Sequence, residues 1–128
     1  MGNRKNILKY VLATDQSLAA TFSTKPTVID YLDNCSYQIN VSTSDSTGSF
    51  AVEVSNDYNV QEPSQYVSNP GTWTALTLSG IPAVQGTDDQ IVINLNQLPF
   101  GAFRLTYTAS TPGTGTCTIV LECKQVGG

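Results

Sequence analysis

The sequence predicts an all-β protein, an antiparallel β-sandwich of about eight strands. First, apolar and polar residues alternate with a period of two, the period of a β-strand, in several stretches. Second, short segments rich in Gly, Pro, Asn and Asp separate these stretches, as turns do. Third, no long segment has the 3.6-residue period of an amphipathic helix. A jelly-roll and an immunoglobulin-like topology both fit this pattern.

Length and composition indicate one globular domain with few charges. The chain has 128 residues, enough to bury a core without metals or disulfides. Charged residues make up 12% of it, about half the usual fraction, while Ser, Thr, Asn and Gln are abundant. Such a surface suits a protein packed among many neighbours. We expect residues 1–12 to form an N-terminal arm or edge strand, and residues 13–128 to form the sandwich.

The charge balance argues against a nucleic-acid-binding protein. The net charge is −4, whereas a phosphate-binding surface needs clustered Lys or Arg. Half of the six basic residues do cluster near the N-terminus, at Arg4, Lys5 and Lys9. They form either a solvated terminus or a basic arm that touches nucleic acid or an acidic partner, and we favour the solvated terminus.

The N-terminal third is expected to supply three short strands. The apolar residues of Ile7–Thr14 also fit a helix, but Tyr10 and Val11 favour a strand. Ser17–Ser23 alternates apolar and small polar residues and ends before a Lys-Pro pair. Val28–Leu32 is a further short extended piece.

The clearest pair of strands lies in Ser36–Tyr58. Two alternating stretches of matching length flank Ser44–Gly48, a polar connection that contains glycine. The segment therefore predicts a hairpin of two neighbouring strands. The side chains expected to face the core are Tyr37, Ile39, Val41, Phe50, Val52 and Val54.

The next segment, Asn59–Gly71, has two prolines and little periodicity, so we expect it to be the longest loop. Loops of this length often carry function or form interfaces, although a plain surface excursion remains the alternative. We also expect it to act as a crossover between the two sheets. Trp73 opens the following strand. A lone Trp before paired leucines predicts a side chain that plugs the core, with a ligand platform as the alternative.

Three further strands complete the predicted sandwich. They are Ile91–Asn96, Ala102–Ser110 and Cys117–Lys124. The Leu98-Pro99 pair ends the first, and a Gly- and Pro-rich turn ends the second. The inward residues expected from the first two are Ile91, Ile93, Leu95, Phe103, Leu105 and Tyr107.

The chain has three cysteines, Cys35, Cys117 and Cys123, with no zinc-binding spacing. Cys117 and Cys123 lie six residues apart in one expected strand, about 20 Å at strand rise, and cannot bridge each other. We expect buried thiols, and a disulfide from Cys35 to either of the others remains open.

No arrangement of residues points to catalysis. The chain has no histidine, so serine and cysteine nucleophiles lack an imidazole base. A pair of carboxylates, as in glycoside hydrolysis, is the remaining option, but nearly all of the acidic residues fall in turns or on outward faces. Asp88 and Asp89 are adjacent and point opposite ways in a strand, which does not suit calcium. We expect no catalytic residue, no metal and no cofactor. Carbohydrate binding by Tyr58, Tyr66 and Trp73 stays open.

No targeting segment is apparent. Lys9 and Tyr10 interrupt the first apolar run, and nothing approaches the about 20 apolar residues of a membrane span. We therefore expect synthesis in a cytoplasm and no membrane partner. The glycosylation sequons at Asn34 and Asn40 carry little weight without a secretory signal.

Five stretches together resemble a family of small tailed-phage virion proteins. They are DNCSYQINV (33–41), STGSFAVEVSNDY (46–58), TWTALTLSG (72–80), QIVINLNQLPFGAFRLTYT (90–108) and GTGTCTIVLECKQVGG (113–128). Such proteins are generally β-sandwich subunits of the particle, and the shared positions lie mainly in core and turns. The resemblance implies a decoration, cement or other minor structural role in the virion, on capsid or tail, after synthesis in the host cytoplasm.

This resemblance implies that the partners are the major capsid protein or other virion proteins. We expect the N-terminal segment to add a strand to an adjacent subunit, and the long loop to form a second contact. We also expect a symmetric homo-oligomer, a trimer on a capsid. The candidate interface residues are Arg4, Lys5, Ile7, Leu8, Tyr10, Tyr58, Glu62, Tyr66 and Trp73.

Overall fold

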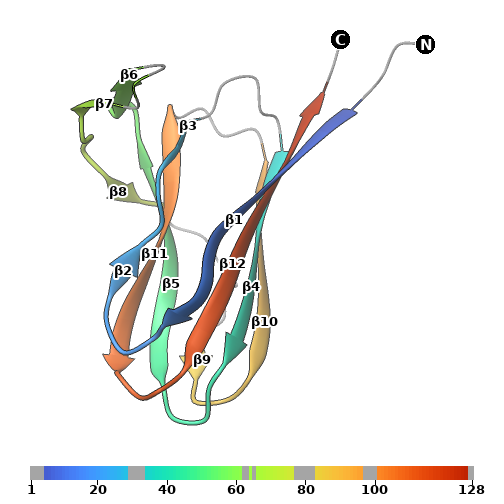
Figure 1. The fold of residues 1–128 in the computed structure, drawn as a ribbon, viewed down its shortest axis with the longest axis vertical. Coiled ribbons are helices and arrows are strands. Elements are labelled where there is room, and N and C mark those ends of the chain that lie inside the picture. Colours follow the sequence, from blue (N-terminus) through green and yellow to red (C-terminus); the bar gives the residue numbers. More distant parts are fainter. Residues whose placement is uncertain are drawn as a thin grey trace.

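A computed structural model describes residues 5–28, 34–61, 64, 66–76, 83–96 and 101–126, which form β-strands joined by turns (Figure 1). The strands within these residues are β1 (Lys5–Ser17), β2 (Phe22–Ser23), β3 (Thr27–Val28), β4 (Asn34–Ser42), β5 (Thr47–Ser55), β6 (Asn59–Gln61), β7 (Tyr66–Asn69), β8 (Thr74–Ala75), β9 (Val84–Gln85), β10 (Asp89–Asn96), β11 (Ala102–Thr111) and β12 (Thr116–Val126). Every recorded pairing among them is antiparallel. The predicted all-β sandwich is therefore confirmed. Across the described ranges, no helix is long and apolar enough to cross a membrane.

Ten of the described strands form two large sheets in jelly-roll order, and β6 and β7 form a separate two-stranded sheet. Sheet A has the order β1-β12-β4-β10, and sheet B has the order β2-β11-β5-β8. In sheet B, β3 continues β2 along β11, and β9 shares with β8 the position beside β5. Pro26 separates β2 from β3, because proline has no N–H to donate to a ladder.

Within sheets A and B, counting each divided strand once gives eight strand positions, which matches the predicted number. They pair first with eighth, second with seventh, third with sixth and fourth with fifth. This is the pairing of one long antiparallel hairpin rolled into two sheets, which is a jelly roll. An immunoglobulin sandwich has a different strand order, so the topology selects the jelly roll.

The segment Ser36–Tyr58 does not form the predicted hairpin. Its two strands exist, but β4 belongs to sheet A and β5 to sheet B. The connection between them therefore turns the chain from one sheet into the other. A corner and a hairpin both need a short polar turn between two strands with inward apolar stripes, so the local pattern does not tell them apart.

The predicted long loop is also organised differently. Residues 59–61 and 66–69 form the β6–β7 hairpin, with Val60 opposite Val67. The strands on either side, β5 and β8, pair within sheet B. The segment is thus an excursion within one sheet and not a crossover between sheets.

The predicted strand over Ser17–Ser23 is largely a bend. β1 continues to Ser17, residues 18–20 turn, and β2 begins only at Phe22. Leu18 is fully buried at this bend, and its amide donates to the Gly115 carbonyl oxygen at 2.9 Å. The small residues after Leu18 allow the chain to pass from sheet A to sheet B.

The core lies between the sheets and contains the inward stripes that the alternation predicts. The predicted inward residues of β4, β5, β10 and β11 are all buried. Tyr37 of sheet A meets Phe103 of sheet B edge to face, with ring centroids 5.9 Å apart. Cys35, Cys117 and Cys123 are also buried, and all three are free thiols, so the prediction of buried thiols is confirmed.

Candidate interaction surface

The outer face of sheet B carries an ion pair at Arg104. Arg104 and Glu53 are register partners, and the alternation that buries Leu105 and Val52 turns both outward. Arg104 Nε and Thr106 Oγ1 each donate to Glu53 Oε1 at 2.8 Å. Partial burial raises the pKa of Glu53, but these bonds and the Arg104 charge outweigh it, so the pKa lies below its ordinary value. Glu53 is therefore ionised at neutral pH and holds the guanidinium in place.

Trp73 lies over this guanidinium. The Arg104 Cζ is 4.4 Å from the indole centroid, and the Tyr58 ring centroid is 5.7 Å from the Trp73 ring. The indole Nε1 donates to the Pro70 carbonyl oxygen at 2.8 Å. Trp73 is half-buried on the outer face, so the prediction that it plugs the core is wrong. Leu76, three residues later and on the opposite face, packs against the core instead.

Asp57 fixes the chain between Tyr58 and Trp73. Its Oδ1 accepts bonds from the Thr72 amide and the Ser55 hydroxyl, both at 2.7 Å. Ser55 Oγ in turn accepts the Tyr58 amide at 3.2 Å. The Thr72 amide is the main cause that holds the pKa of Asp57 below its ordinary value. The carboxylate thus sets the relative positions of the two rings.

A groove beside these rings runs between β1 and β3. We call it the aromatic groove, and it has a volume of about 270 Å³. Tyr58 lines the groove and also contacts Trp73, which lies over Arg104, so the groove is continuous with this pair. Tyr10 and Val28 are 43% and 49% exposed there, so the groove presents apolar surface. The lining residues are Tyr10, Leu12, Lys25, Pro26, Thr27, Val28, Tyr58 and Val60.

Three of the predicted interface residues meet at this surface. Tyr10 and Tyr58 line the aromatic groove, and Trp73 contacts Tyr58. Tyr66 does not line it. This residue lies on β7 opposite Gln61 and is 62% exposed.

The other predicted interface residues lie at the chain's N-terminal end or beyond the described part. Lys5, Ile7 and Leu8 belong to β1, where they pair with the last residues of β12. Arg4 and Glu62 lie outside the described residues. β1 continues to Ser17, so the predicted arm 1–12 and the start of the predicted sandwich share one strand.

Sequence reasoning missed Arg104, Lys25 and Val28. Alternation turns Arg104 outward on its strand, but its importance depends on contacts with Glu53 and Trp73, which lie far away in sequence. Lys25 and Val28 come from the short pieces around Pro26, where alternation is too brief to assign a face. No feature of the local sequence indicates that these residues lie near Tyr10 and Tyr58.

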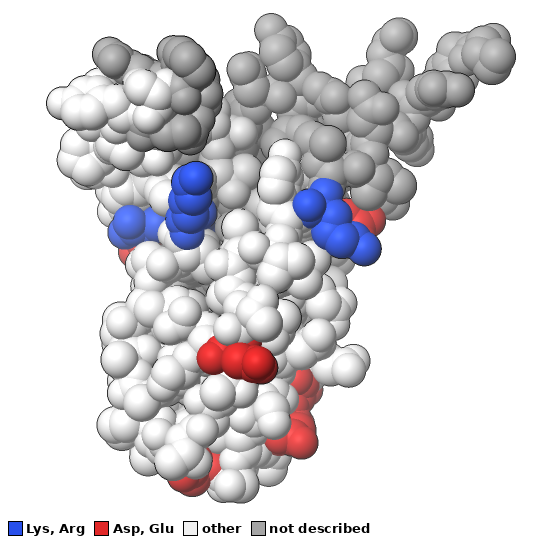
Figure 2. Space-filling model, viewed as in Figure 1, with Lys and Arg blue, Asp and Glu red and all other residues white. Residues whose placement is uncertain are grey.

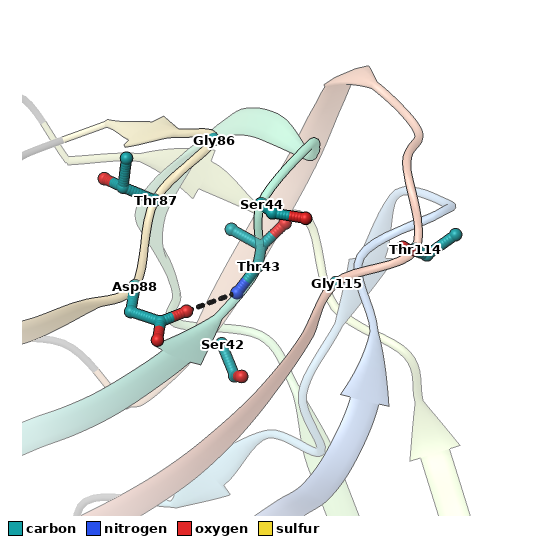
Figure 3. A pocket seen from close by; sticks show the side chains of 8 residues that line it. All are labelled: Ser42, Thr43, Ser44, Gly86, Thr87, Asp88, Thr114 and Gly115. Carbon is teal, nitrogen blue, oxygen red and sulfur yellow. Dashed lines mark hydrogen bonds between the residues drawn. The ribbon is translucent and has the colours of Figure 1, made fainter.

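A second hollow lies at the lower end of the molecule as drawn in Figure 1, where three connections meet (Figure 3). It has a volume of about 560 Å³ and is lined by Ser42, Thr43, Ser44, Gly86, Thr87, Asp88, Thr114 and Gly115. Asp88 Oδ1 accepts the Thr43 amide at 2.8 Å, as Figure 3 shows. Asp45 accepts the Thr114 amide at 2.8 Å, and this bond is the main cause that lowers the pKa of Asp45. These carboxylates hold the connections together.

Charge is distributed unevenly along the long axis. Figure 2 shows Lys and Arg in the upper half of this face and most Asp and Glu side chains in the lower half. Lys25 lines the aromatic groove and Arg104 lies beside it, whereas Asp45, Asp88 and Asp89 lie at or next to the lower connections. Within the described ranges, no group of three Cys, Asp or Glu residues is placed to hold a metal ion.

Sequence comparison finds no match: no family model and no curated protein matches the chain. Solved structures that resemble it include the following two. The SPBc2 prophage-derived protein YomS aligns with 94% of this chain and 95% of its own, at 6% identity and a TM-score of 0.48. A chain from the structure of infectious bursal disease virus, Gx strain, aligns with 99% of this chain at 15% identity and a TM-score of 0.54. Only 33% of that viral chain is covered, so the present chain spans about a third of its length. The likeness to this viral chain shows a shared fold.

Proposed function

We propose that the protein is a non-enzymatic structural subunit of a bacteriophage virion, specifically a capsid decoration or cement subunit that binds neighbouring particle proteins. The jelly-roll order supports this, because the fold recurs in virus structures. A fold alone does not define a function, so the contact surface carries the proposal.

The observation that carries it is the position of the exposed apolar side chains. Of six such large side chains among the described residues, Tyr10 and Val28 share the aromatic groove, and Val67 is the register partner of Val60, which also lines it. Val11 and Tyr66, next to Tyr10 and Val67 in their strands, point to the opposite faces. A groove that exposes large apolar side chains next to one another is typical of a protein-binding site.

The chemistry of the groove suggests what its partner presents. Tyr10, Val28 and Tyr58 suit an apolar or aromatic side chain, and Lys25 suits a carboxylate next to it. Arg104 is already paired with Glu53, so it serves to hold Trp73 in place. We therefore propose that a short apolar and acidic segment of a neighbouring virion protein occupies the groove.

The edge strand β1 offers a second contact. Within the described residues β1 pairs only with β12, so its other edge has no recorded partner strand. Its register is continuous from Lys5 to Val11 and then shifts twice, at the bulged half of the strand. The regular half suits strand addition by a neighbouring subunit. We propose that such contacts also build a symmetric homo-oligomer, a trimer, which light scattering on the purified protein tests directly.

The main test quantifies the protein on phage particles. Particles of a phage whose genome encodes the protein are purified on a density gradient, and mass spectrometry counts the copies of the protein per particle. We expect many copies per particle, and a roughly tenfold loss for Tyr10→Ser, because the groove loses a central apolar contact.

Val92→Ser is the matched control. Val92 is 55% exposed, but it lies on β10, at the opposite edge of sheet A. The Val92→Ser variant should be retained on the particles at the wild-type level. Absence of the wild-type chain from particles contradicts the proposal, and equal loss of both variants contradicts the role of the groove.

A carbohydrate-binding module on a tail or fibre is the second candidate. The contact between Tyr58 and Trp73 favours it, because sugar rings stack on exposed aromatic faces. Glycan-array binding that disappears with Trp73→Ala or Tyr66→Ala, while the fold persists, favours this alternative. Glycan binding that persists in both variants, or that the unsubstituted protein does not show, excludes a carbohydrate site at Trp73 and Tyr66.

A further inference from the structure

Two of the three thiols face each other across neighbouring strands. Cys35 on β4 and Cys123 on β12 are register partners in an antiparallel pair. Both side chains point into the core, with exposed fractions of 7% and 0%. Antiparallel partners have Cα atoms about 4.5 or 5.5 Å apart, and disulfides join Cα atoms about 4.4 to 6.8 Å apart. The backbone therefore already has the spacing that a disulfide needs.

Cys117 provides a contrast within the same strand. It is buried on the same face of β12, but its register partner is Val41. It lies six residues from Cys123, roughly 20 Å along the strand. Burial also raises the pKa of the Cys117 thiol to about 11, which suppresses its reactive thiolate form.

We propose that Cys35 and Cys123 are a modification site that forms an intrachain disulfide between β4 and β12 when the protein meets an oxidising medium. The register thereby selects Cys123, not Cys117, as the partner of Cys35. This inference goes beyond the proposed function and does not depend on it.

The oxidant is a small disulfide such as glutathione disulfide. The thiolate of Cys35 attacks one of its sulfurs, a Cys35–glutathione bond forms, and one glutathione thiolate leaves. The thiolate of Cys123 then attacks Cys35 sulfur, the Cys35–Cys123 bond forms, and the second glutathione leaves. In total two protein thiols lose two protons and two electrons, and one glutathione disulfide is reduced to two thiols.

Cys35 is the thiol that reacts first. It is the second residue of β4 and is the slightly exposed member of the pair. The hydrogen bond from Cys123 lowers the pKa of Cys35, while the same bond raises the pKa of Cys123. Cys35 thus combines access with the larger thiolate fraction.

The bond should stabilise the fold because it closes a long loop, from residue 35 to residue 123. Cross-linking distant residues restricts the unfolded chain. β12 lies between β1 and β4 in sheet A, so the link also fastens the last strand of the chain. We expect the oxidised protein to melt roughly 10 °C above the reduced protein.

The experiment uses the purified full chain, first reduced and then incubated with glutathione disulfide. Thiol titration in urea should fall from three thiols to one. Peptide mapping without reduction should identify one bridge, between Cys35 and Cys123. Cys117→Ser should keep both the bridge and the rise in melting temperature, whereas Cys35→Ser and Cys123→Ser should lose both.

Several results would overturn the proposal. They are retention of three thiols, a bridge that contains Cys117, a bridge between two chains, or glutathione that remains on Cys35. Because serine in a buried site can destabilise the chain, the peptide map of the unsubstituted protein decides the matter by itself.

Discussion

At the lower end of the jelly roll and beside the aromatic groove at its upper end, side chains form similar hydrogen bonds to the backbone of distant connections. The two regions differ in which side chains these bonds leave at the surface. At the lower end, Ser46 Oγ donates to the Pro112 carbonyl oxygen at 2.9 Å and accepts the Gly115 amide at 3.0 Å. Thr43 Oγ1 accepts the Ser46 amide at 2.9 Å. These bonds join the β4–β5 connection to the β11–β12 connection, and the polar groups are satisfied within the fold.

At the upper end, an aspartate again ties two distant connections together. Asp57 accepts the Thr72 amide just as Asp45 accepts the Thr114 amide. Here, however, the residues next to the aspartate are Tyr58 and, one position after Thr72, Trp73, whose rings lie at the surface. The same bond, from a backbone amide to an aspartate, therefore joins connections at the lower end and positions exposed aromatic side chains at the upper end.

A hollow rich in hydroxyls is therefore not automatically a binding site. Asp88 and Asp45 bind backbone amides, so the lower hollow follows from the way the connections are fastened. The aromatic groove keeps exposed apolar atoms that no described residue covers. Changes at the lower end should therefore cost stability, and changes at the groove should cost association.

The largest expected effect is at Leu18, which anchors the lower end. Leu18→Ala removes a fully buried side chain at the bend between the sheets and should destabilise the protein by about 3 kcal/mol. Urea unfolding measures this change. Val11→Ala is the control, since Val11 is 62% exposed and should change stability by less than about 0.5 kcal/mol. A loss below about 1 kcal/mol at Leu18 would show that the bend is not an anchor.

The next effect is at Ser46, which is fully buried. Ser46→Ala leaves the Gly115 amide and the Pro112 carbonyl without this partner and should cost about 2 kcal/mol. The matched control is Ser44→Ala, an exposed serine in the same connection. Equal unfolding midpoints for the two variants would contradict the role assigned to the Ser46 hydroxyl.

A smaller effect should appear in acid. The pKa of Asp45 is lower in the folded than in the unfolded chain, so its stabilisation is present above about pH 4 and is lost as the pH falls through the folded pKa. Asp45→Asn should therefore reduce the fall in melting temperature between about pH 5 and pH 3. Asp57→Asn should act in the same direction at the upper end. Melting curves identical to those of the unsubstituted protein at every pH would disprove this linkage.

The smallest effect is the coupling between Trp73 and Arg104. A double-mutant cycle with Trp73→Ala and Arg104→Ala should give about 0.5 to 1 kcal/mol, because the pair is partly exposed. Unfolding measurements on the four proteins supply the cycle. Strict additivity would mean that the stacked geometry contributes nothing to stability.

Core positions could be predicted from the sequence, whereas the sheet to which each strand belongs could not. Alternation correctly placed Tyr37, Phe50 and Leu105 in the core, because successive side chains of any strand point to opposite faces. It did not reveal that β4 and β5 lie in different sheets, because a hairpin and a corner present the same local pattern. Of the candidate surface, Tyr10, Tyr58 and Trp73 were predicted as single residues, while the groove that joins two of them was not.

Local sequence is enough to predict the fold class, the inward stripes and the sites of most turns, since each depends on residues that are neighbours along the chain. The three-dimensional fold adds the jelly-roll order, the position of Trp73 on Arg104 and the facing of Cys35 and Cys123. These features join residues that are far apart in sequence. They depend on which strands pair and in what register, and that choice is made by the packing of the whole core.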